Sequence, residues 1–409
     1  MILLYWTISV INLAYLIFKK RNIDLFTIGF LSLIYYTLPA FFGTISLGKH
    51  IVNMQIHNKV YYFLIFLQLL FLIVIVFNDK RINNKELKEK GNKQVSKYYI
   101  FCIFFLTILF YCIEFLISGF DTFFSLDKAE IRMTTFYGLG IWGALMSFFL
   151  GIKYKYNYII IGSLIFILFS LFVGSRAYIA TAILGCILLL SKNKIRLVNS
   201  WRNILVLIIS FLFLVFYKTI YTAVKTLDSD ILTNSIKNIN FSELPFFSES
   251  NAILSNLNVI LLYEIKNEYS VLEYSLHQIP FSSLFLTDKY VTFSRFVSAN
   301  VHPDIHFGMG GNLWGEIYSV FGFVGMYIAA ILWVLLIYIT NISLYKFRGT
   351  ILILPAIIYV VFYVHRIDLS FVIGSFQSNI FIIFLAFLFY SIYIKQFIRY
   401  KVMDYTLVK

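Results

Sequence analysis

The chain has 409 residues, of which 60% are hydrophobic, 20% are aromatic and only 13% are charged. This composition excludes an ordinary soluble domain, in which about 25% of the residues are charged. The net charge of +14 would suit nucleic acid, but its distribution along the chain follows membrane topology instead, so we expect no nucleic-acid partner.

Apolar runs long enough to span a bilayer recur along the sequence. Eleven are predicted to be transmembrane helices, at residues 2–18, 24–42, 60–77, 98–117, 137–152, 157–173, 177–191, 203–220, 317–340, 351–365 and 371–394. No basic leader or small-residue cleavage site precedes the first run, which predicts that it is retained. The predicted fold class is therefore all-α: a polytopic integral membrane protein with a single transmembrane domain over residues 1–409.

The positions of the lysines and arginines predict the orientation of these spans. If the N-terminus lies outside and the spans alternate, most of the 34 basic residues fall on the inner side, as the positive-inside rule requires. Residues 222–313 then form one long outer loop. Apolar periodicity at residues 253–265 and 271–286 predicts short helices in this loop that lie along the outer membrane surface.

Several cations lie at or near the outer ends of spans, against the charge bias of the topology. Guanidinium groups bind phosphate oxygens in a bidentate way, so a group of such residues from distant parts of the chain would suit a lipid-linked pyrophosphate. For each cation a structural reading stays open, such as snorkelling to the membrane surface, or a pair between Arg366 and Asp368. The candidates are Arg132, Arg176, Lys218, Lys225, Arg295 and Arg366.

Residues 302–325 bring together glycines, two histidines, aromatics and a carboxylate in a chain that elsewhere is mostly hydrocarbon. Glu316 is predicted to lie in the first turns of a membrane helix, where an unpaired carboxylate is costly. We interpret the stretch as the wall of a site at a membrane surface. A buried pair between Glu316 and an arginine is the structural alternative, and a metal site at His302 and His306 is a weaker one.

A second carboxylate, Glu114, is predicted near the outer end of its span. Such a group either reaches the outer surface or faces a polar cavity. The sequence does not decide between the two.

At this point the residues resemble a known family. Gly174-Ser175-Arg176 opening a span, the long outer loop, and Gly311-Asn312-Leu313-Trp314-Gly315-Glu316-Ile317-Tyr318 followed by Phe321-Gly322 and Gly325 are similar to the bacterial oligosaccharide repeat-unit polymerases, the Wzy-type O-antigen polymerases. The turn with Arg366 and Asp368 looks like the site of a late arginine in that family. The resemblance covers roughly residues 170–370.

The resemblance implies a GT-C-like membrane glycosyltransferase in the bacterial inner membrane, with its active site facing the periplasm or cell exterior. Such enzymes transfer a sugar chain from undecaprenyl pyrophosphate to a new lipid-linked repeat unit and release undecaprenyl pyrophosphate. The implied partners are these lipid-linked oligosaccharides, membrane lipids, a chain-length regulator and a flippase. No cofactor, metal or nucleotide sugar is implied.

The predicted roles follow from the chemistry of that transfer. The developing charge of the pyrophosphate needs cations, and the attacking hydroxyl would be assisted by a general base. We expect acceptor-sugar contacts from the stretch that contains Asn312. The candidates are His306, Glu316 and His302 for the base, Arg176, Arg366, Arg295, Arg132 and Lys218 for the pyrophosphate, and Asn312, Trp314 and Tyr318 for the sugar.

Two other functions remain as alternatives: a flippase for the same lipid-linked oligosaccharides, and a membrane acyltransferase that modifies surface glycans. A flippase should show internal repeats and charges at mid-membrane, whereas the charges here gather at one leaflet. An acyltransferase of this kind would be expected to place a histidine deep in a span, and none of the six histidines lies there.

Overall fold

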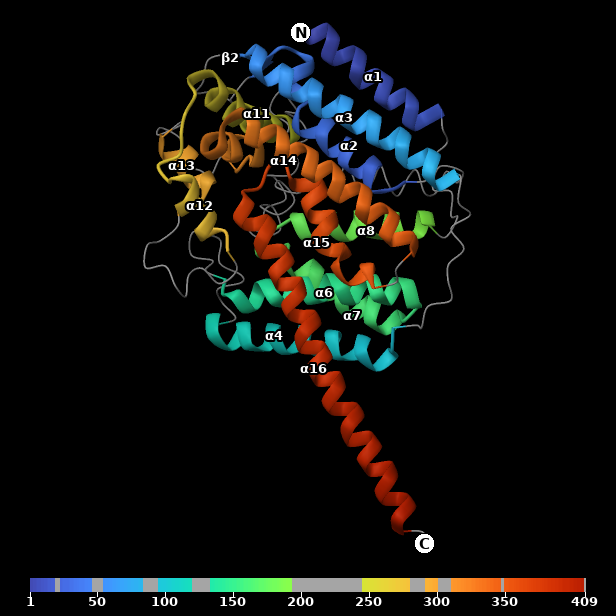
Figure 1. The fold of residues 1–409 in the computed structure, drawn as a ribbon. Coiled ribbons are helices and arrows are strands. Elements are labelled where there is room, and N and C mark those ends of the chain that lie inside the picture. The colour runs from blue at the N-terminus through green and yellow to red at the C-terminus, as the bar shows by residue number, and fades with distance from the viewer. Residues whose placement is uncertain are drawn as a thin grey trace, which may run out of the picture. The chain divides into compact units, whose positions relative to one another are not determined.

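A computed structural model describes residues 1–18, 23–45, 54–83, 95–119, 133–192, 245–279, 291–300, 310–346 and 349–407 of the chain. Nearly all of its regular structure is α-helical (Figure 1). Five of the described helices are long and apolar enough to cross a membrane, and five more are apolar but only 10–17 residues long. The prediction of a helical, membrane-embedded protein is confirmed at this level, whereas the number of eleven spans stays a prediction.

The five long apolar helices are α3 (Asn58–Asn83), α4 (Lys97–Ser118), α6 (Thr135–Tyr154), α14 (Leu313–Lys346) and α16 (Leu369–Leu407). The shorter ones are α1 (Ile2–Phe18), α2 (Leu25–Tyr36), α7 (Asn157–Phe169), α8 (Ala177–Lys192) and α15 (Thr350–Tyr363). Together they cover ten of the eleven predicted spans. The remaining one, at residues 203–220, lies outside the described residues.

The chain divides into two compact units. Unit 1 comprises residues 1–89, 190–346 and 357–374, and unit 2 comprises residues 90–189, 347–356 and 375–409. The helices α15 and α16 each contribute residues to both units. All of the polar contacts developed below as a candidate site lie within unit 1.

In unit 1, α3 packs against α1 and α14, and α14 also packs against α2 (Figure 1). A short 3-10 helix, η1 (Leu38–Phe41), follows α2, and the two-residue strands β1 (Thr44–Ile45) and β2 (Met54–Gln55) pair antiparallel after it. The side chain of Asp24 caps α2 by accepting the Thr27 N–H at 3.0 Å. It also accepts a hydrogen bond from Asn341 Nδ2 of α14 at 3.1 Å, so one buried carboxylate joins the two helices.

Three helices lie in the described parts of the predicted outer loop: α11 (Pro245–Tyr263), α12 (Val271–His277) and α13 (Phe293–Asn300). Ser270 and Glu273 form a capping box that starts α12. The helix α11 is longer than the short helices expected from the sequence, and it packs against α14, α2, α3 and η1. Its buried residues include Leu254 and Leu257, so α11 is part of the core of unit 1.

In unit 2, α6 packs against both α4 and α7. Small residues make this close approach possible. A Cβ atom on Gly140 would lie 2.9 Å from the ring of Tyr111, and one on Gly143 would lie 2.6 Å from Thr107 Oγ1. Glycines at such contacts let helices approach in a setting where hydrocarbon burial gives little drive for association.

The long helix α14 is interrupted where the sequence has Gly322. This residue adopts φ 68° and ψ −166°, a conformation that a side chain would strain. The break divides α14 into two parts. The first turns follow the N-cap Asn312 and extend past Tyr318, and the remainder of the helix is long and apolar. The break therefore allows the polar end of α14 to take its own direction against α11.

Candidate functional site

Four parts of unit 1 meet at one polar cluster. They are the start of α14, the turn between α15 and α16, the start of α13, and the start of α11. These parts are far apart in the sequence, and side-chain contacts join them. We define the polar cluster as Glu249, Ser294, Glu316, Arg366 and Asp368.

The start of α14 is fixed by Asn312. Its Oδ1 accepts the backbone N–H groups of Trp314 and Gly315, each at 3.1 Å, and its Nδ2 donates to the Ile253 carbonyl of α11 at 3.3 Å. Asparagine is a favoured N-cap because its side chain satisfies backbone N–H groups that lack a helical partner. The amide of Asn312 is buried and engaged on both sides, so it anchors α14 to α11.

The carboxylate of Glu316 lies one turn later and is fully buried. Its Oε2 accepts the backbone N–H of Leu369, the first residue of α16, at 2.6 Å. An acidic group at a helix N-terminus is stabilised by the unsatisfied N–H groups and by the helix dipole. Glu316 thus joins the first turns of α14 and α16, and its predicted position in the first turn of a membrane helix is confirmed.

Asp368 makes a similar connection to α13. Its Oδ2 accepts the backbone N–H of Ser294 at 3.0 Å, and its carbonyl accepts the N–H of Phe371 within α16 at 3.1 Å. Its Oδ1 is buried and has no hydrogen-bond partner among the described residues. Burial therefore raises the pKa of Asp368, although the hydrogen bond from Ser294 opposes this shift.

Two glycines make room for this arrangement. A Cβ atom on Gly311 would lie 1.7 Å from Asp368 Oδ1, so no side chain fits there. Gly310 adopts φ 77° and lies beside Arg366, and its carbonyl accepts a hydrogen bond from Asn256 Nδ2 at 3.1 Å. At these two glycines the close neighbours of the backbone are Arg366 and Asp368 of the same chain.

Arg366 follows α15 and forms an ion pair through Nη1 with Oε1 of Glu249 on α11. A third of its side chain is exposed, whereas that of Glu249 is only 10% exposed. Burial opposes the charge, but the Glu249 carboxylate outweighs it and raises the pKa of Arg366. The guanidinium has five N–H donors, and among the described residues its ion pair is with Glu249 through Nη1.

The partner of Arg366 is therefore Glu249, and the alternative of an Arg366–Asp368 pair is wrong. Neither periodicity nor a motif marked Glu249, which lies in the predicted long loop, 117 positions before Arg366. Its other oxygen, Oε2, accepts the Tyr35 hydroxyl of α2 at 3.3 Å. A carboxylate just ahead of an apolar helical run is the only hint that sequence reasoning had.

His365, next to Arg366, also escaped sequence reasoning as a buried anchor. Its Nδ1 accepts the indole N–H of Trp314 at 2.8 Å, and its ring lies against Tyr36, Trp314 and Trp333. Burial lowers the pKa of His365 to about 3, so the ring is neutral at physiological pH, with its proton on Nε2. This neutral, aromatic-lined contact fixes the turn that carries Arg366.

The remaining predicted residues are distributed as follows. Arg295 is exposed on α13, directly after the Ser294 that Asp368 holds. Trp314 and Tyr318 are buried, with 1% and 4% exposed. Arg176 is partly exposed at the start of α8, where Gly174 with φ 80° makes the turn from α7, and it belongs to unit 2. His302, His306, Arg132 and Lys218 lie outside the described residues, as does the alternative of a histidine metal site.

The segments joined at the polar cluster thus carry two cations, Arg295 and Arg366, from elements about 70 residues apart. Arg366 is paired with Glu249, and Asp368 holds the backbone N–H of Ser294, the residue before Arg295. Such an arrangement can bind an anionic oxygen in a fork and keep it at a defined place. Comparison of the chain with protein-family models, with curated proteins and with solved structures found no match.

Proposed function

We propose that this protein is a membrane glycosyltransferase that joins lipid-linked oligosaccharide repeat units into a surface polysaccharide. In this proposal the chain has eleven spans and a GT-C-like fold, lies in the bacterial inner membrane, and acts on its outer side. The transfer moves a sugar chain from a polyisoprenyl pyrophosphate to the hydroxyl of a second lipid-linked unit, and releases the pyrophosphate lipid.

One observation carries the proposal: the hydrogen bond from the Ser294 N–H to Asp368 joins the start of α13, which carries exposed Arg295, to the turn that carries partly exposed Arg366. A leaving pyrophosphate develops negative charge, and fixed cations stabilise it without reorganising during the reaction. Both arginines were singled out from the sequence for this chemistry. For Arg176, Arg132 and Lys218 the same role stays a prediction from the sequence.

The buried groups take a supporting part in this proposal. Asn312, Trp314 and Glu316 are engaged with protein partners in the described structure, so we assign them to holding the site's frame rather than to the sugar surface. The general base is then His306 or His302, or the hydroxyl attacks with little assistance. Glu316 remains a candidate base only if substrate binding frees it from Leu369.

The test is polymer synthesis by purified protein in liposomes supplied with one lipid-linked repeat unit. The wild type should give a ladder of products and release polyisoprenyl pyrophosphate. Arg366→Ala should reduce the rate by about 100- to 1,000-fold, the range for losing one fixed charge-stabilising group. The matched control is Lys59→Ala, because Lys59 forms an ion pair with Glu264 at 2.6 Å on an exposed part of the same unit.

Folded Arg366→Ala protein that still makes polymer at the wild-type rate would contradict the assignment. A wild-type protein that makes no polymer from any repeat unit, but moves it across the liposome membrane, would favour the flippase instead. One observation points that way: Oδ1 of Asp368 is buried without a hydrogen-bond partner in the described part of the chain and the pKa of Asp368 is raised, which a proton-coupled transporter could use. Transport that depends on a proton gradient would decide between the two.

A further inference from the structure

The three lysines of unit 2 whose side chains are described lie at one end of its helices. Lys97 begins α4, and Lys153 and Lys155 lie at the end of α6 (Figure 1). The start of α4 meets the end of α6, because the Val95 N–H donates to the Tyr154 hydroxyl at 3.4 Å. The charge distribution of the sequence predicts this end on the inner side of the membrane.

No acidic group offsets these lysines among the described side chains of unit 2. The one carboxylate there is that of Glu114, which lies near the opposite end of α4 and accepts the Thr134 N–H. Residues 84–94, outside the described part of the chain, add four lysines and two glutamates, so the balance stays positive. Lys97 and Lys155 are exposed. This end of unit 2 is therefore a basic surface.

A row of aromatic rings accompanies the lysines. Nζ of Lys97 lies 5.7 Å from the centroid of the Phe101 ring, which stacks on Tyr158 of α7 with centroids 5.5 Å apart. Tyr158 is followed by Tyr156 at 6.1 Å, and Tyr156 by Tyr154 at 6.5 Å. Tyrosines gather at the level of lipid headgroups, where the ring meets hydrocarbon and the hydroxyl meets water. The row therefore marks the level at which the lysines meet the membrane surface.

The turn between α6 and α7 fixes the position of Lys155 in this row. The Gly151 carbonyl accepts the backbone N–H of Lys155 and, at 3.0 Å, that of Tyr156. Lys155 has φ 60° and ψ 42°, the left-handed conformation that commonly ends a helix. The lysine thus extends from a closed turn that is hydrogen-bonded to the end of α6.

Exposed hydrocarbon continues from the lysines along both helices. Phe101 and Phe105 are exposed on α4, and Ile161 and Ile165 are exposed on α7. In each pair the residues are four positions apart, so they share one face of their helix. A ligand that matches this surface has an anionic head and an apolar chain. A phospholipid has both, whereas a free phosphate would leave the apolar faces unused.

We propose that this end of unit 2 binds anionic phospholipids, with their headgroups at Lys97, Lys153 and Lys155 and their acyl chains on the exposed faces of α4 and α7. Ammonium groups bind phosphate oxygens as point charges with three N–H donors. An anionic lipid is favoured over a zwitterionic one because each lysine near the surface adds attraction for negative headgroups. The proposal does not rest on the glycosyltransferase activity.

The test is photolabelling of the full chain in nanodiscs of phosphatidylcholine. The two probes are phosphatidylglycerol and phosphatidylcholine, each with a diazirine at the start of an acyl chain, and labelled peptides are located by mass spectrometry. We expect phosphatidylglycerol to label residues 95–101 and 153–158 about tenfold more strongly, since one lysine near the surface is worth about fivefold. Added salt should reduce this difference, because salt screens exposed charges.

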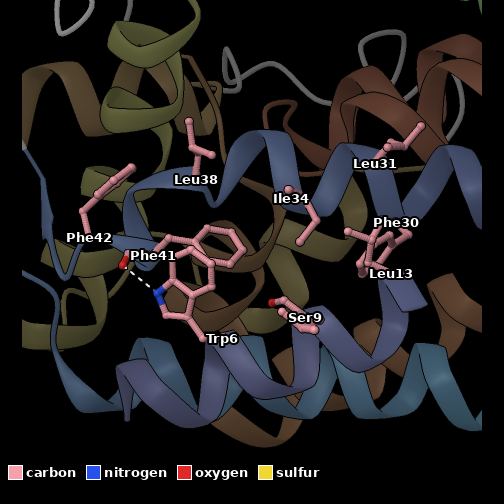
Figure 2. A pocket seen from close by; sticks show the side chains of 10 residues that line it. Trp6, Ser9, Leu13, Phe30, Leu31, Ile34, Leu38, Phe41 and Phe42 are labelled. Atoms are coloured by element: carbon pink, nitrogen blue, oxygen red, sulfur yellow. Dashed lines mark hydrogen bonds between the residues drawn. The ribbon is translucent and has the colours of Figure 1, made fainter. Parts of the chain in front are cut away.

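The apolar groove along α1 and α2 of unit 1 is the internal reference (Figure 2). Trp6, Leu31 and Phe42 are among its ten lining residues, and none of the ten is charged. Contact of an acyl chain with such a surface does not depend on headgroup charge. Both probes should therefore label residues 6–13 and 30–42 equally. The same excess of phosphatidylglycerol in the groove would assign the preference to the net charge of +14 and overturn the inference.

A double variant provides the second readout. Lys97→Gln combined with Lys155→Gln removes two charges and keeps long polar side chains. We expect the preference for phosphatidylglycerol to fall to about twofold or less. The matched control is Lys266→Gln in unit 1, because Lys266 is exposed but lies between Glu264 and Glu268 in the sequence. That variant should keep the full preference.

Three outcomes would overturn the inference. The first is equal labelling of residues 95–101 and 153–158 by the two probes. The second is loss of this label to inorganic phosphate at constant ionic strength, since the surface would then bind the free anion rather than a lipid. The third is an unchanged preference in the folded double variant. Because the comparison of the probes uses the wild type, it decides the matter even if the double variant does not fold.

Discussion

The two units each bury a glutamate near the end of an apolar helix, and they use it differently. In unit 2, Glu114 of α4 accepts the Thr134 N–H at 3.0 Å, the Thr134 hydroxyl, the Tyr137 N–H at 3.1 Å and the Ser118 hydroxyl at 2.7 Å. In unit 1, Glu316 of α14 accepts the N–H of Leu369 at the start of α16. Both carboxylates therefore cap another helix.

The difference lies in what surrounds each cap. The partners of Glu114 in the described structure are hydroxyl and N–H groups, which satisfy it completely. Glu316 holds Leu369, which follows the turn with Arg366 and Asp368; Arg366 is one-third exposed there, and Oδ1 of Asp368 has no hydrogen-bond partner among the described residues. A buried carboxylate in a membrane helix is thus no sign of function by itself; donors and charges left over beside it are the better sign.

The largest effect on stability is expected where Glu114 is removed. Glu114→Ala leaves four donors without their acceptor, and each buried unsatisfied donor costs about 1–3 kcal/mol. The thermal midpoint of unfolding in detergent should fall far more than for Glu114→Gln, which keeps an acceptor. Activity per folded molecule should be retained in both variants. Loss of polymer synthesis from folded Glu114→Gln would break the comparison, because it would make the unit 2 cap functional.

The next largest effect is expected at Gly311. Gly311→Ala forces a methyl group against Asp368 Oδ1, and overpacking of this kind typically costs about 1–3 kcal/mol. The matched control in unit 2 is Gly138→Ala in α6, where a Cβ atom would meet nothing within 4 Å. That change should be neutral or slightly stabilising, because alanine is the better helix former. Equal melting temperatures for the two alanine variants would show that Gly311 does not need its close approach.

A smaller effect is expected from the cap in unit 1. Glu316→Gln keeps an acceptor for the Leu369 N–H but removes the charge near the helix dipole, a contribution of about 0.3–1 kcal/mol. We expect a modest fall in thermal stability and a larger fall in polymer synthesis, because the turn that carries Arg366 is held by a weaker hydrogen bond. A purely structural cap would lose activity only as far as it loses folded protein. If Glu316→Gln behaves in that way, the two glutamates do not differ in function.

The smallest effect is the pH dependence contributed by His365. Its pKa is lowered from 6.5 to about 3 in the folded state, so the unfolded chain binds the proton more readily. The contribution of the neutral ring to the free energy of unfolding is complete above pH 6.5 and is lost as the pH falls toward 3. Melting curves between pH 7.5 and 5 should therefore decline less steeply for His365→Phe than for the wild type, although the variant starts lower because the Trp314 hydrogen bond is gone. A parallel decline would assign the acid sensitivity to other groups.

Hydrophobic periodicity and the positions of the charged residues predicted the apolar helices and the position of Glu316 from the sequence alone. The apolar helices and the place of Glu316 in the first turn of one of them follow from local rules, because a membrane helix needs an apolar run and Glu316 directly precedes one. The cations predicted for the outer side also stand out one by one in the sequence, because charges are rare in such a chain.

The tertiary structure alone decided the partners. Glu249 pairs with Arg366 and Ser294 with Asp368 across 117 and 74 positions, and nothing in local spacing encodes which carboxylate meets which cation. Glu114 was expected at the surface or in a polar cavity, and it caps α6 instead, because a buried charge takes whatever donors the packing brings. Local sequence fixes which residues are costly to bury; only packing between distant helices decides how that cost is met.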